Sequence, residues 1–323
     1  MLSAYHSESL GNRQLVLGTR TSPMAMTQAR AVRAMTAAIV PGTEVEIRGI
    51  KTSADDWPGA LSELGGKGAF TREIDRALVH GEIDLAVHCL KDVPGDVPEP
   101  AELVWAAYLA RGDVRDCLVF PASSGYTTLA DLPMGARVGT SAARRKAQLL
   151  RLRPDIEVVP VRGNADTRIR CLDGGGTDAL VVARAGLDRL DLPGRAAHVL
   201  GMKDMCPAVG AGVIAVRCRA GDQPVLELLL ELDDDETRRQ ATAERGFLRG
   251  LHGHCGSPVA GHCAPTPDGR QLLLRGMVFA PDGSTVIDTW ETGDPGKPAD
   301  LGERAAGVLL GKGARDLMWG TPL

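Results

Sequence analysis

Residues 65–94, GGKGAFTREIDRALVHGEIDLAVHCLKDVP, contain the pattern that decides the fold. A glycine-rich polar loop, expected over 55–68, leads into a helical pattern over 70–80 that Gly81 ends. A buried strand is then expected over 83–88, followed by a turn. A helix followed at once by a short apolar strand is typical of α/β layers around a largely parallel sheet.

The same alternation extends on both sides of this stretch. Before it we expect strands over 15–18 and 45–50 and a helix over 23–39. After it we expect strands over 117–120, 137–139, 158–161 and 179–183 and helices over 143–152 and 166–172. Two such blocks predict two similar α/β domains with a cleft between them.

The pattern changes after Gly221. Helices are expected over 224–232 and 236–251, with Asp235 as N-cap, and a last helix over 298–310. Strands over 272–279 and 284–289 flank Asp282-Gly283, a pair typical of a hairpin turn. These elements predict a smaller α+β domain at the C-terminal end.

Composition narrows the function classes. With 37 Lys plus Arg against 41 Asp plus Glu, the formal charge of −4 argues against nucleic-acid binding. The 14 N-terminal residues lack an apolar signal core, and no apolar run is long enough to cross a membrane. We therefore expect a cytoplasmic protein, in which seven scattered cysteines without a Cys-x-x-Cys pair are mostly reduced core thiols.

Arginines gather where strands pass into helices. Because ligands of such sheets bind beyond the carboxyl ends of strands, this pattern predicts a site for an acidic ligand with several carboxylates or phosphates. A single arginine in such a place is more often a solvated surface charge, whereas a set at equivalent positions is harder to explain that way. The set comprises Arg20, Arg144, Arg145, Arg162, Arg168 and Arg189.

Two further stretches could carry chemistry. Lys91 and Asp92 follow a buried strand, where the carboxylate could act as a general acid or base, although an exposed ion pair in a turn is the simpler interpretation. Cys255 lies on a glycine-containing loop and could be a nucleophile or an attachment point. The nearby His252, His254, His262 and Cys263 could suggest zinc, but their spacing matches no standard site, and we expect no metal.

Nine stretches together resemble the hydroxymethylbilane synthase (porphobilinogen deaminase) family from about residue 13 to the C-terminus. They include VLGTRTSPMA (16–25), GGKGAFTREID (65–75), DLAVHCLKDVP (84–94), VGTSAARRKAQL (138–149), VRGNADTR (161–168) and TAERGFLRGLHGHCGSPVAG (242–261). The others are ARAGLDRL (183–190), PAVGAGVIAV (207–216) and GARD (313–316). Each is weak evidence alone, but their shared order and spacing are specific.

The resemblance implies two periplasmic-binding-protein-like domains and a third domain, with bounds of 13–110 plus 210–230, 111–209 and 231–323. It implies a monomeric transferase that joins four porphobilinogens into a linear tetrapyrrole, as in porphyrin and heme biosynthesis. It also implies a dipyrromethane cofactor bound by a thioether to Cys255 and a mobile loop containing Lys67 and Phe70. Asp92 matches the catalytic carboxylate, with Lys91 beside it. Cofactor contacts are implied for Lys91, Thr140, Ser141, Arg144, Arg145, Gly163 and Arg168, and substrate contacts for Arg20, Ser22, Arg162 and Arg189.

Several positions depart from the usual pattern of the family. The family usually has Lys at the position of Glu63, Ser at those of Cys89 and Ala142, and Gln at that of Ala211. It usually has Gly at the position of His254, Arg at that of Ser53 and Glu at that of Arg217. Two of these changes remove hydroxyls near the expected cofactor, at about 1 kcal/mol for each lost hydrogen bond. Two alternatives therefore stay open beside the deaminase. They are a paralogue that uses another pyrrole or releases another product, and an anion-binding module without catalysis.

Overall fold

A computed structural model describes residues 10, 13–57 and 68–319, in which the chain forms two compact units. The first contains the chain up to Arg111 together with Val213–Arg239, and the second contains Gly112–Gly212 together with the chain from Gln240 onward. The chain therefore leaves the first unit and returns to it. The expected division into three domains stays a prediction.

The first unit is built on a five-stranded sheet in the order β2-β1-β3-β10-β4. Strands β1 (Leu15–Arg20), β2 (Val45–Ile50) and β3 (Leu85–Cys89) are parallel. Strand β10 (Ile214–Arg219) lies antiparallel between β3 and β4 (Leu103–Tyr108). The sheet is thus largely parallel, as predicted, and its one antiparallel strand is the segment that returns to the unit.

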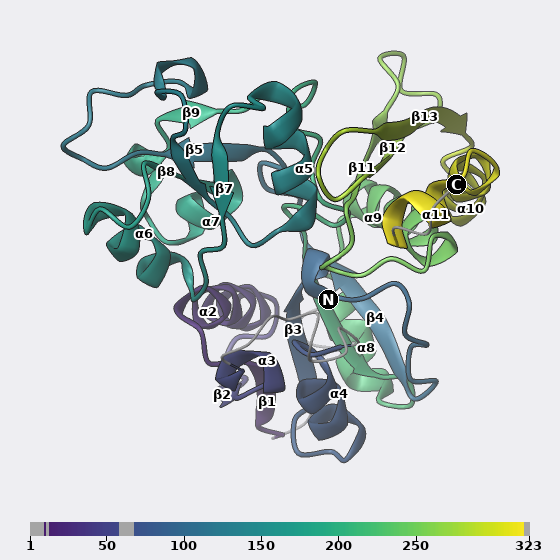
Figure 1. The fold of residues 1–323 in the computed structure, drawn as a ribbon. Helices are drawn as coiled ribbons and strands as arrows, with labels where there is room; N and C mark the ends of the chain where they lie inside the picture. The colour runs from purple at the N-terminus through teal and green to yellow at the C-terminus, as the bar shows by residue number, and fades with distance from the viewer. Residues whose placement is uncertain (1–9, 11–12, 58–67, 320–323) are drawn as a thin grey trace. The chain divides into compact units, whose positions relative to one another are not determined.

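Helices cover both faces of this sheet (Figure 1). The helices α2 (Pro23–Ile39) and α8 (Gln223–Leu230) pack on the face that carries Leu85 and Val87. Helix α4 (Arg72–Val79) packs on the opposite face, which carries Ala86. Because alternate residues of a strand point to opposite faces, a strand that is buried on both reads as a continuous apolar run.

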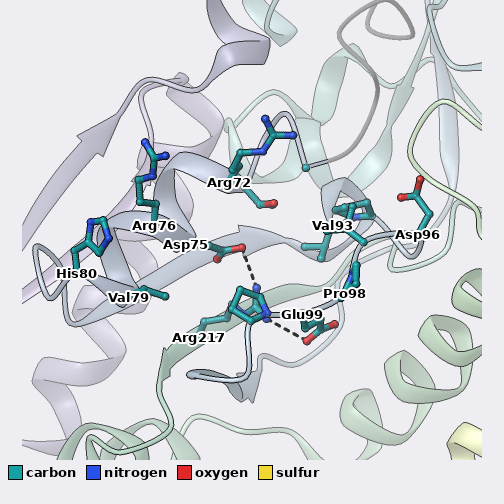
Figure 2. A pocket seen from close by; sticks show the side chains of 15 residues that line it. Arg72, Asp75, Arg76, Val79, His80, Val93, Asp96, Pro98, Glu99 and Arg217 are labelled. Carbon is teal, nitrogen blue, oxygen red and sulfur yellow. Dashed lines mark hydrogen bonds and ion pairs between the residues drawn. The ribbon is translucent and has the colours of Figure 1, made fainter.

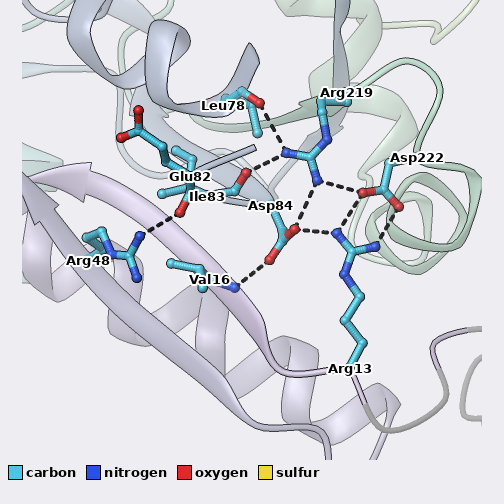
Figure 3. Close-up of polar contacts among 9 residues, drawn as sticks. All are labelled: Arg13, Val16, Arg48, Leu78, Glu82, Ile83, Asp84, Arg219 and Asp222. Atoms are coloured by element: carbon cyan, nitrogen blue, oxygen red, sulfur yellow. Dashed lines mark hydrogen bonds and ion pairs between the residues drawn. The ribbon is translucent and has the colours of Figure 1, made fainter. Parts of the chain in front are cut away.

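A cluster of four charged side chains fixes the base of the sheet (Figure 3). Arg13 binds Asp84 and Asp222, and Arg219 lies 2.9 Å from the Asp84 carboxylate and 2.8 Å from that of Asp222. Asp84 also accepts a hydrogen bond from the Val16 amide at 2.8 Å. Two cations and two carboxylates thereby join the starts of β1 and β3 to the end of β10.

The second unit contains a sheet with an equivalent order, β7-β6-β8-β5-β9. Strands β6 (Arg137–Gly139), β7 (Glu157–Val159) and β8 (Ala179–Ala183) are parallel, and β5 (Asp116–Val119) is antiparallel between β8 and β9 (His198–Val199). Helix α5 (Ala143–Leu152) covers one face. The helices α6 (Ala165–Asp173) and α7 (Arg184–Arg189) cover the other. The expected pair of similar α/β sheet domains is therefore present.

The same unit ends in an antiparallel sheet of β11 (Val259–Pro265), β12 (Leu272–Phe279) and β13 (Val286–Gly293). Helix α9 (Asp235–Gly250) begins in the first unit and continues into the second, where α10 (Pro298–Gly311) and α11 (Ala314–Trp319) complete this α+β part. Gly283 has a φ of +77° in the turn between β12 and β13, as the expected hairpin requires.

Some expectations were wrong in detail. Thr237 donates its amide hydrogen to Asp234 at 2.8 Å, so Asp234 rather than Asp235 caps α9. The segment from Asp55 was expected to be loop, but α3 (Ser53–Asp56) begins it, because Thr52 and Asp55 form a capping box. Four strands were not anticipated, namely β4, β9, β10 and β11.

Candidate functional site

In the first unit, Lys91 and Asp92 lie in a 3-10 turn (Leu90–Asp92) directly after β3. Leu90 is buried in the core, its amide donates to the Val213 carbonyl at 3.1 Å, and its carbonyl accepts from the Val93 amide at 3.0 Å. The turn is therefore held at both ends. The Asp92 side chain keeps 29% of its surface exposed, so its carboxylate can reach a ligand.

Arg20, the last residue of β1, faces that carboxylate. The distance from its Nη1 to Asp92 Oδ2 is 4.0 Å, and its guanidinium lies 4.4 Å from the centre of the Phe70 ring. Its Nη2 donates to Asp55 Oδ1 at 2.5 Å. Burial lowers the pKa of Arg20, but the hydrogen bond to Asp55 and the charge of Asp92 raise it more. Arg20 therefore stays cationic beside two carboxylates.

Asp55 is held in place by its own segment. Its Oδ2 accepts from the Thr52 amide at 3.1 Å and from the Thr52 hydroxyl at 2.8 Å. Burial raises the pKa of Asp55, but the hydrogen bonds from Arg20 and Thr52 lower it below its usual value. Sequence reasoning missed this residue, although the Thr-x-x-Asp spacing of a capping box was a usable signal.

Two neighbouring polar residues are fixed by local structure. Ser22 caps α2, where its hydroxyl accepts from the Ala25 amide at 3.3 Å. Cys89, which replaces the family's usual serine, lies 3.0 Å from Nε2 and 3.3 Å from Oε1 of the buried Gln28. The thiol therefore takes the place of a hydroxyl in a polar contact. Lys67 and Glu63 lie outside the described residues.

In the second unit, Arg144 and Arg145 of α5 share one carboxylate. Asp116 Oδ2 accepts from Arg144 Nη2 at 2.5 Å, and Asp116 Oδ1 accepts from Arg145 Nη2 at 2.7 Å. All three residues are buried. Burial raises the pKa of Asp116, but the two guanidinium charges lower it far below its usual value. The group is therefore fully ionised and carries a net charge of +1.

One N–H donor of the Arg144, Arg145 and Asp116 group is without a hydrogen-bond partner among the described residues. This donor is Arg145 Nε, whereas Nη1 of the same side chain donates to the Val181 carbonyl at 3.1 Å. A buried cationic N–H without an acceptor is costly, so it favours an acidic ligand. Asp116 is the first residue of β5, and the sequence gave no signal of its role.

The remaining predicted residues of this unit surround the ends of β6, β7 and β8. Thr140 Oγ1 accepts from the Ala142 amide at 3.2 Å, and Ser141 Oγ donates to the Val161 carbonyl at 2.9 Å. Arg168 Nε donates to the Gly163 carbonyl at 2.8 Å, and Arg189 Nη2 donates to the Gly212 carbonyl at 2.6 Å. Arg162 is half-buried at the start of the same loop as Gly163.

Gly163 is required by its backbone. Its φ is +95°, and a Cβ atom there would lie 2.9 Å from the Thr167 side chain. The next residue, Asn164, caps α6 by accepting from the Thr167 amide at 2.9 Å. The loop can therefore bring backbone groups close to a ligand at the start of a helix.

Cys255 stands at the corner of a turn. The Ser257 amide donates to the His254 carbonyl at 2.9 Å, and the Ser257 hydroxyl accepts from the His254 amide at 3.0 Å. Ser257 is buried, whereas Cys255 between them is exposed. By contrast, burial raises the pKa of the Cys117 and Cys206 thiols to about 12. Cys255 is thus presented to a reactant, while those two thiols are not.

His254 and Cys263, which lie near Cys255 in the sequence, make contacts within the protein. His254 Nδ1 accepts from the Gly256 amide at 3.1 Å, inside the turn. Cys263 is buried in β11, where its amide donates to Glu244 at 2.8 Å. Over residues 13–57 and 68–319, no group of three or more His, Cys, Asp or Glu side chains is placed to hold a metal ion. No helix in the same part of the chain is long and apolar enough to cross a membrane.

Comparison with known proteins covers almost the whole chain. A family model described as "Porphobilinogen deaminase, dipyromethane cofactor binding domain" matches residues 15–227, and one described as "Porphobilinogen deaminase, C-terminal domain" matches residues 239–311. The protein named porphobilinogen deaminase 2 of Streptomyces coelicolor is 48% identical over 302 residues, covering 94% of this chain and 95% of its own. The porphobilinogen deaminase of Rubrobacter xylanophilus is 45% identical over 307 residues, covering 94% and 96%.

A solved structure gives a more distant likeness. The periplasmic VFT2 domain of BvgS from Bordetella pertussis overlaps 72% of this chain and 92% of its own at 18% identity, with a TM-score of 0.40. An overlap at this level supports no inference about activity.

Proposed function

This chain belongs to the porphobilinogen deaminase family. We propose that three groups of its residues carry out the family's reaction: one holds the cofactor, one acts on the reacting pyrrole and one binds the incoming substrate. The activity is that of a hydroxymethylbilane synthase, a transferase that condenses four porphobilinogens, with loss of ammonia, into a linear tetrapyrrole. The match of both family models, in order and over most of the chain, carries this assignment. The relatives favour neither a binding module nor a different product.

The first group would hold the cofactor. The family's cofactor is a dipyrromethane, which supplies the primer to which pyrrole units are joined. The exposed thiol of Cys255 fits the attachment point, since it stands on a turn that other residues hold rigid. The net positive charge of Arg144, Arg145 and Asp116, with the unpartnered Arg145 Nε, fits an acidic group. We assign further contacts to Lys91, Thr140, Ser141, Gly163 and Arg168.

The second group is Asp92. A carboxylate can hold the pyrrole N–H of the substrate and stabilise the positive charge that develops on the ring as ammonia leaves. It can also take the proton that the ring must lose after the new bond forms. Asp92 suits both roles because its turn is fixed while its side chain is partly exposed.

The third group would bind the incoming substrate. Porphobilinogen carries an acetate and a propionate, and Arg20 is a half-buried cation within 4.0 Å of Asp92. Asp55 now takes the position that a substrate carboxylate would need on Arg20. Substrate binding would therefore exchange one carboxylate for another, with little change in the charge around Arg20. Ser22, Arg162 and Arg189 would complete the substrate contacts, and Phe70 would hold the guanidinium.

We further propose that the enzyme works in the cytoplasm as a monomer, without nucleic-acid or membrane partners. The net charge of −4 supports the proposed absence of nucleic-acid and membrane partners, since it would repel both nucleic acid and acidic lipid surfaces.

Steady-state kinetics of Asp92→Asn with porphobilinogen test the central role. The amide keeps the shape but not the charge, so we expect a loss of kcat of roughly 10²-fold or more. A variant that retained normal turnover would remove Asp92 from the mechanism.

A further inference from the structure

The first unit contains a cavity of about 420 Å³ that the proposed mechanism does not use (Figure 2). It lies between α4 and the segment over residues 93–100, on the sheet face that α4 covers. Val79, Val93, Val97 and three prolines supply an apolar lining. A volume of this size is within the range of small-molecule sites, which is roughly 300–1,000 Å³.

A buried guanidinium forms part of the wall of this cavity. Arg217 is 2% exposed, its Nη1 lies 3.0 Å from Asp75 Oδ2, and its Nη2 lies 3.1 Å from Glu99 Oε2. Its guanidinium carbon stands 4.1 Å from the centre of the Trp105 ring, whose Nε1 donates to Glu99 at 2.7 Å. The cation is thereby fixed from three sides.

Three polar atoms of the lining residues are buried without hydrogen-bond partners among the described residues. They are the donor Arg217 Nε and the acceptors Asp75 Oδ1 and Asp96 Oδ1. Asp75 Oδ1 faces His88, with its oxygen 3.5 Å from Nε2. A buried acceptor left unpaired destabilises the protein, and a ligand N–H could satisfy the one on Asp96.

The lining of the cavity carries both acidic and basic groups. Asp75 and Glu99 flank the guanidinium of Arg217, and Asp96 adds a third carboxylate to the lining. Exposed Arg72, Arg76 and His80, all contributed by the α4 side, supply the basic groups of the lining. A ligand with an N–H at one end and an acid at the other matches this combination.

We propose that this cavity binds a small heteroaromatic carboxylic acid with a ring N–H. The N–H would donate to Asp96 Oδ1, the ring would lie against the valines and prolines, and the carboxylate would face Arg76. Substrate-like monopyrroles belong to this chemical class, so their identification as the natural ligand rests on the proposed function, whereas the site itself does not.

The site depends on Arg217. With a glutamate at this position, the lining would gain a fourth carboxylate and lose the guanidinium that Asp75 and Glu99 bind. Two of those carboxylates would lose the cation that now binds them at 3.0 and 3.1 Å. The arrangement is therefore particular to chains with an arginine at this place.

Isothermal titration calorimetry with indole-3-propionate as the probe tests the proposal on the full-length holoenzyme. We expect saturable binding at one site per chain, weakened about tenfold or more by Asp96→Asn and by Arg76→Gln, since each removes a charge-assisted hydrogen bond. Arg33→Gln, which changes an exposed arginine of α2, serves as the matched control and should bind as the wild type does. Arg217→Glu should abolish binding, and Asp96→Asn and Arg76→Gln keep the test valid if that variant does not fold.

The failure of this proposal is distinguishable from failure of the proposed function. Absence of binding, or binding that neither Asp96→Asn nor Arg76→Gln weakens, would overturn the proposal while porphobilinogen turnover continued unchanged. Competition by porphobilinogen for the probe in the Asp92→Asn variant would identify monopyrroles as ligands. A probe that binds as expected but is not displaced would restrict the site to other acids of the same class.

Discussion

Replacement of Asp116 by Asn should destabilise the second unit by about 3–5 kcal/mol, the usual cost of removing one partner from a buried ion pair. Asp116 lies between two buried guanidiniums, at 2.5 Å from Arg144 and 2.7 Å from Arg145. With charge centres about 4 Å apart and an effective dielectric constant near 20, each pair contributes roughly 4 kcal/mol before desolvation. Asn would leave two like charges facing each other and turn an N–H toward one of them.

Urea unfolding followed by far-UV circular dichroism measures this change through the shift in midpoint at constant slope. Asp113→Asn is the matched control, because Asp113 forms an exposed pair with Arg115 at 2.6 Å only three residues away along the chain. Exposed pairs contribute about 0–1 kcal/mol, so the control should unfold nearly as the wild type does. Equal midpoints for the two variants would refute the assignment of Asp116 as the counter-ion of both arginines.

Three further predictions concern the charge of Asp116 and the packing of two glycines in α10. Burial raises the pKa of Asp116, but the two arginines lower it well below its ordinary 3.8, so the stabilisation by this carboxylate is complete above that pH. The difference in unfolding free energy between wild type and Asp116→Asn should therefore narrow as the pH falls below about 4. A difference that stayed constant in acid titrations would contradict this. Gly302→Ala should destabilise by about 1–3 kcal/mol in thermal unfolding, because its Cβ would lie 2.6 Å from the Phe247 amide nitrogen. Gly307→Ala in the same helix meets nothing within 4 Å and should stabilise by about 0.5–1 kcal/mol; the opposite order of the two would count against the packing described.

The layered fold could be predicted because its buried strands read as short apolar runs between helical patterns. Strand β10 was missed since Arg217 interrupts its apolar run, and only tertiary contacts with Asp75 and Glu99 explain how a fully buried guanidinium fits there. Strand β11 was missed for a similar reason, because it begins just after the loop that carries Cys255 and includes a glycine, a histidine and a proline.

The candidate site was predictable as a set of residue types rather than as an arrangement. Arginines after strands indicated an acidic ligand, but nothing in the sequence paired Arg144 and Arg145 with a carboxylate 28 and 29 residues away. Arg20 was expected to meet substrate, yet its contact with Asp55 depends on how the segment after β2 folds back. Local patterns identify such groups, while their partners are decided by long-range packing.

Intact-protein mass spectrometry tests the central claim most directly, namely that this chain builds a tetrapyrrole on Cys255. The purified protein should carry a covalent mass of two linked pyrroles, which grows by pyrrole units after porphobilinogen is added. Cys255→Ser should lack this mass, whereas Cys171→Ser, which changes the other exposed thiol among the described residues, should keep it. An unmodified wild type that ignores porphobilinogen, or a Cys255→Ser variant that still carries the pyrroles, would contradict the account.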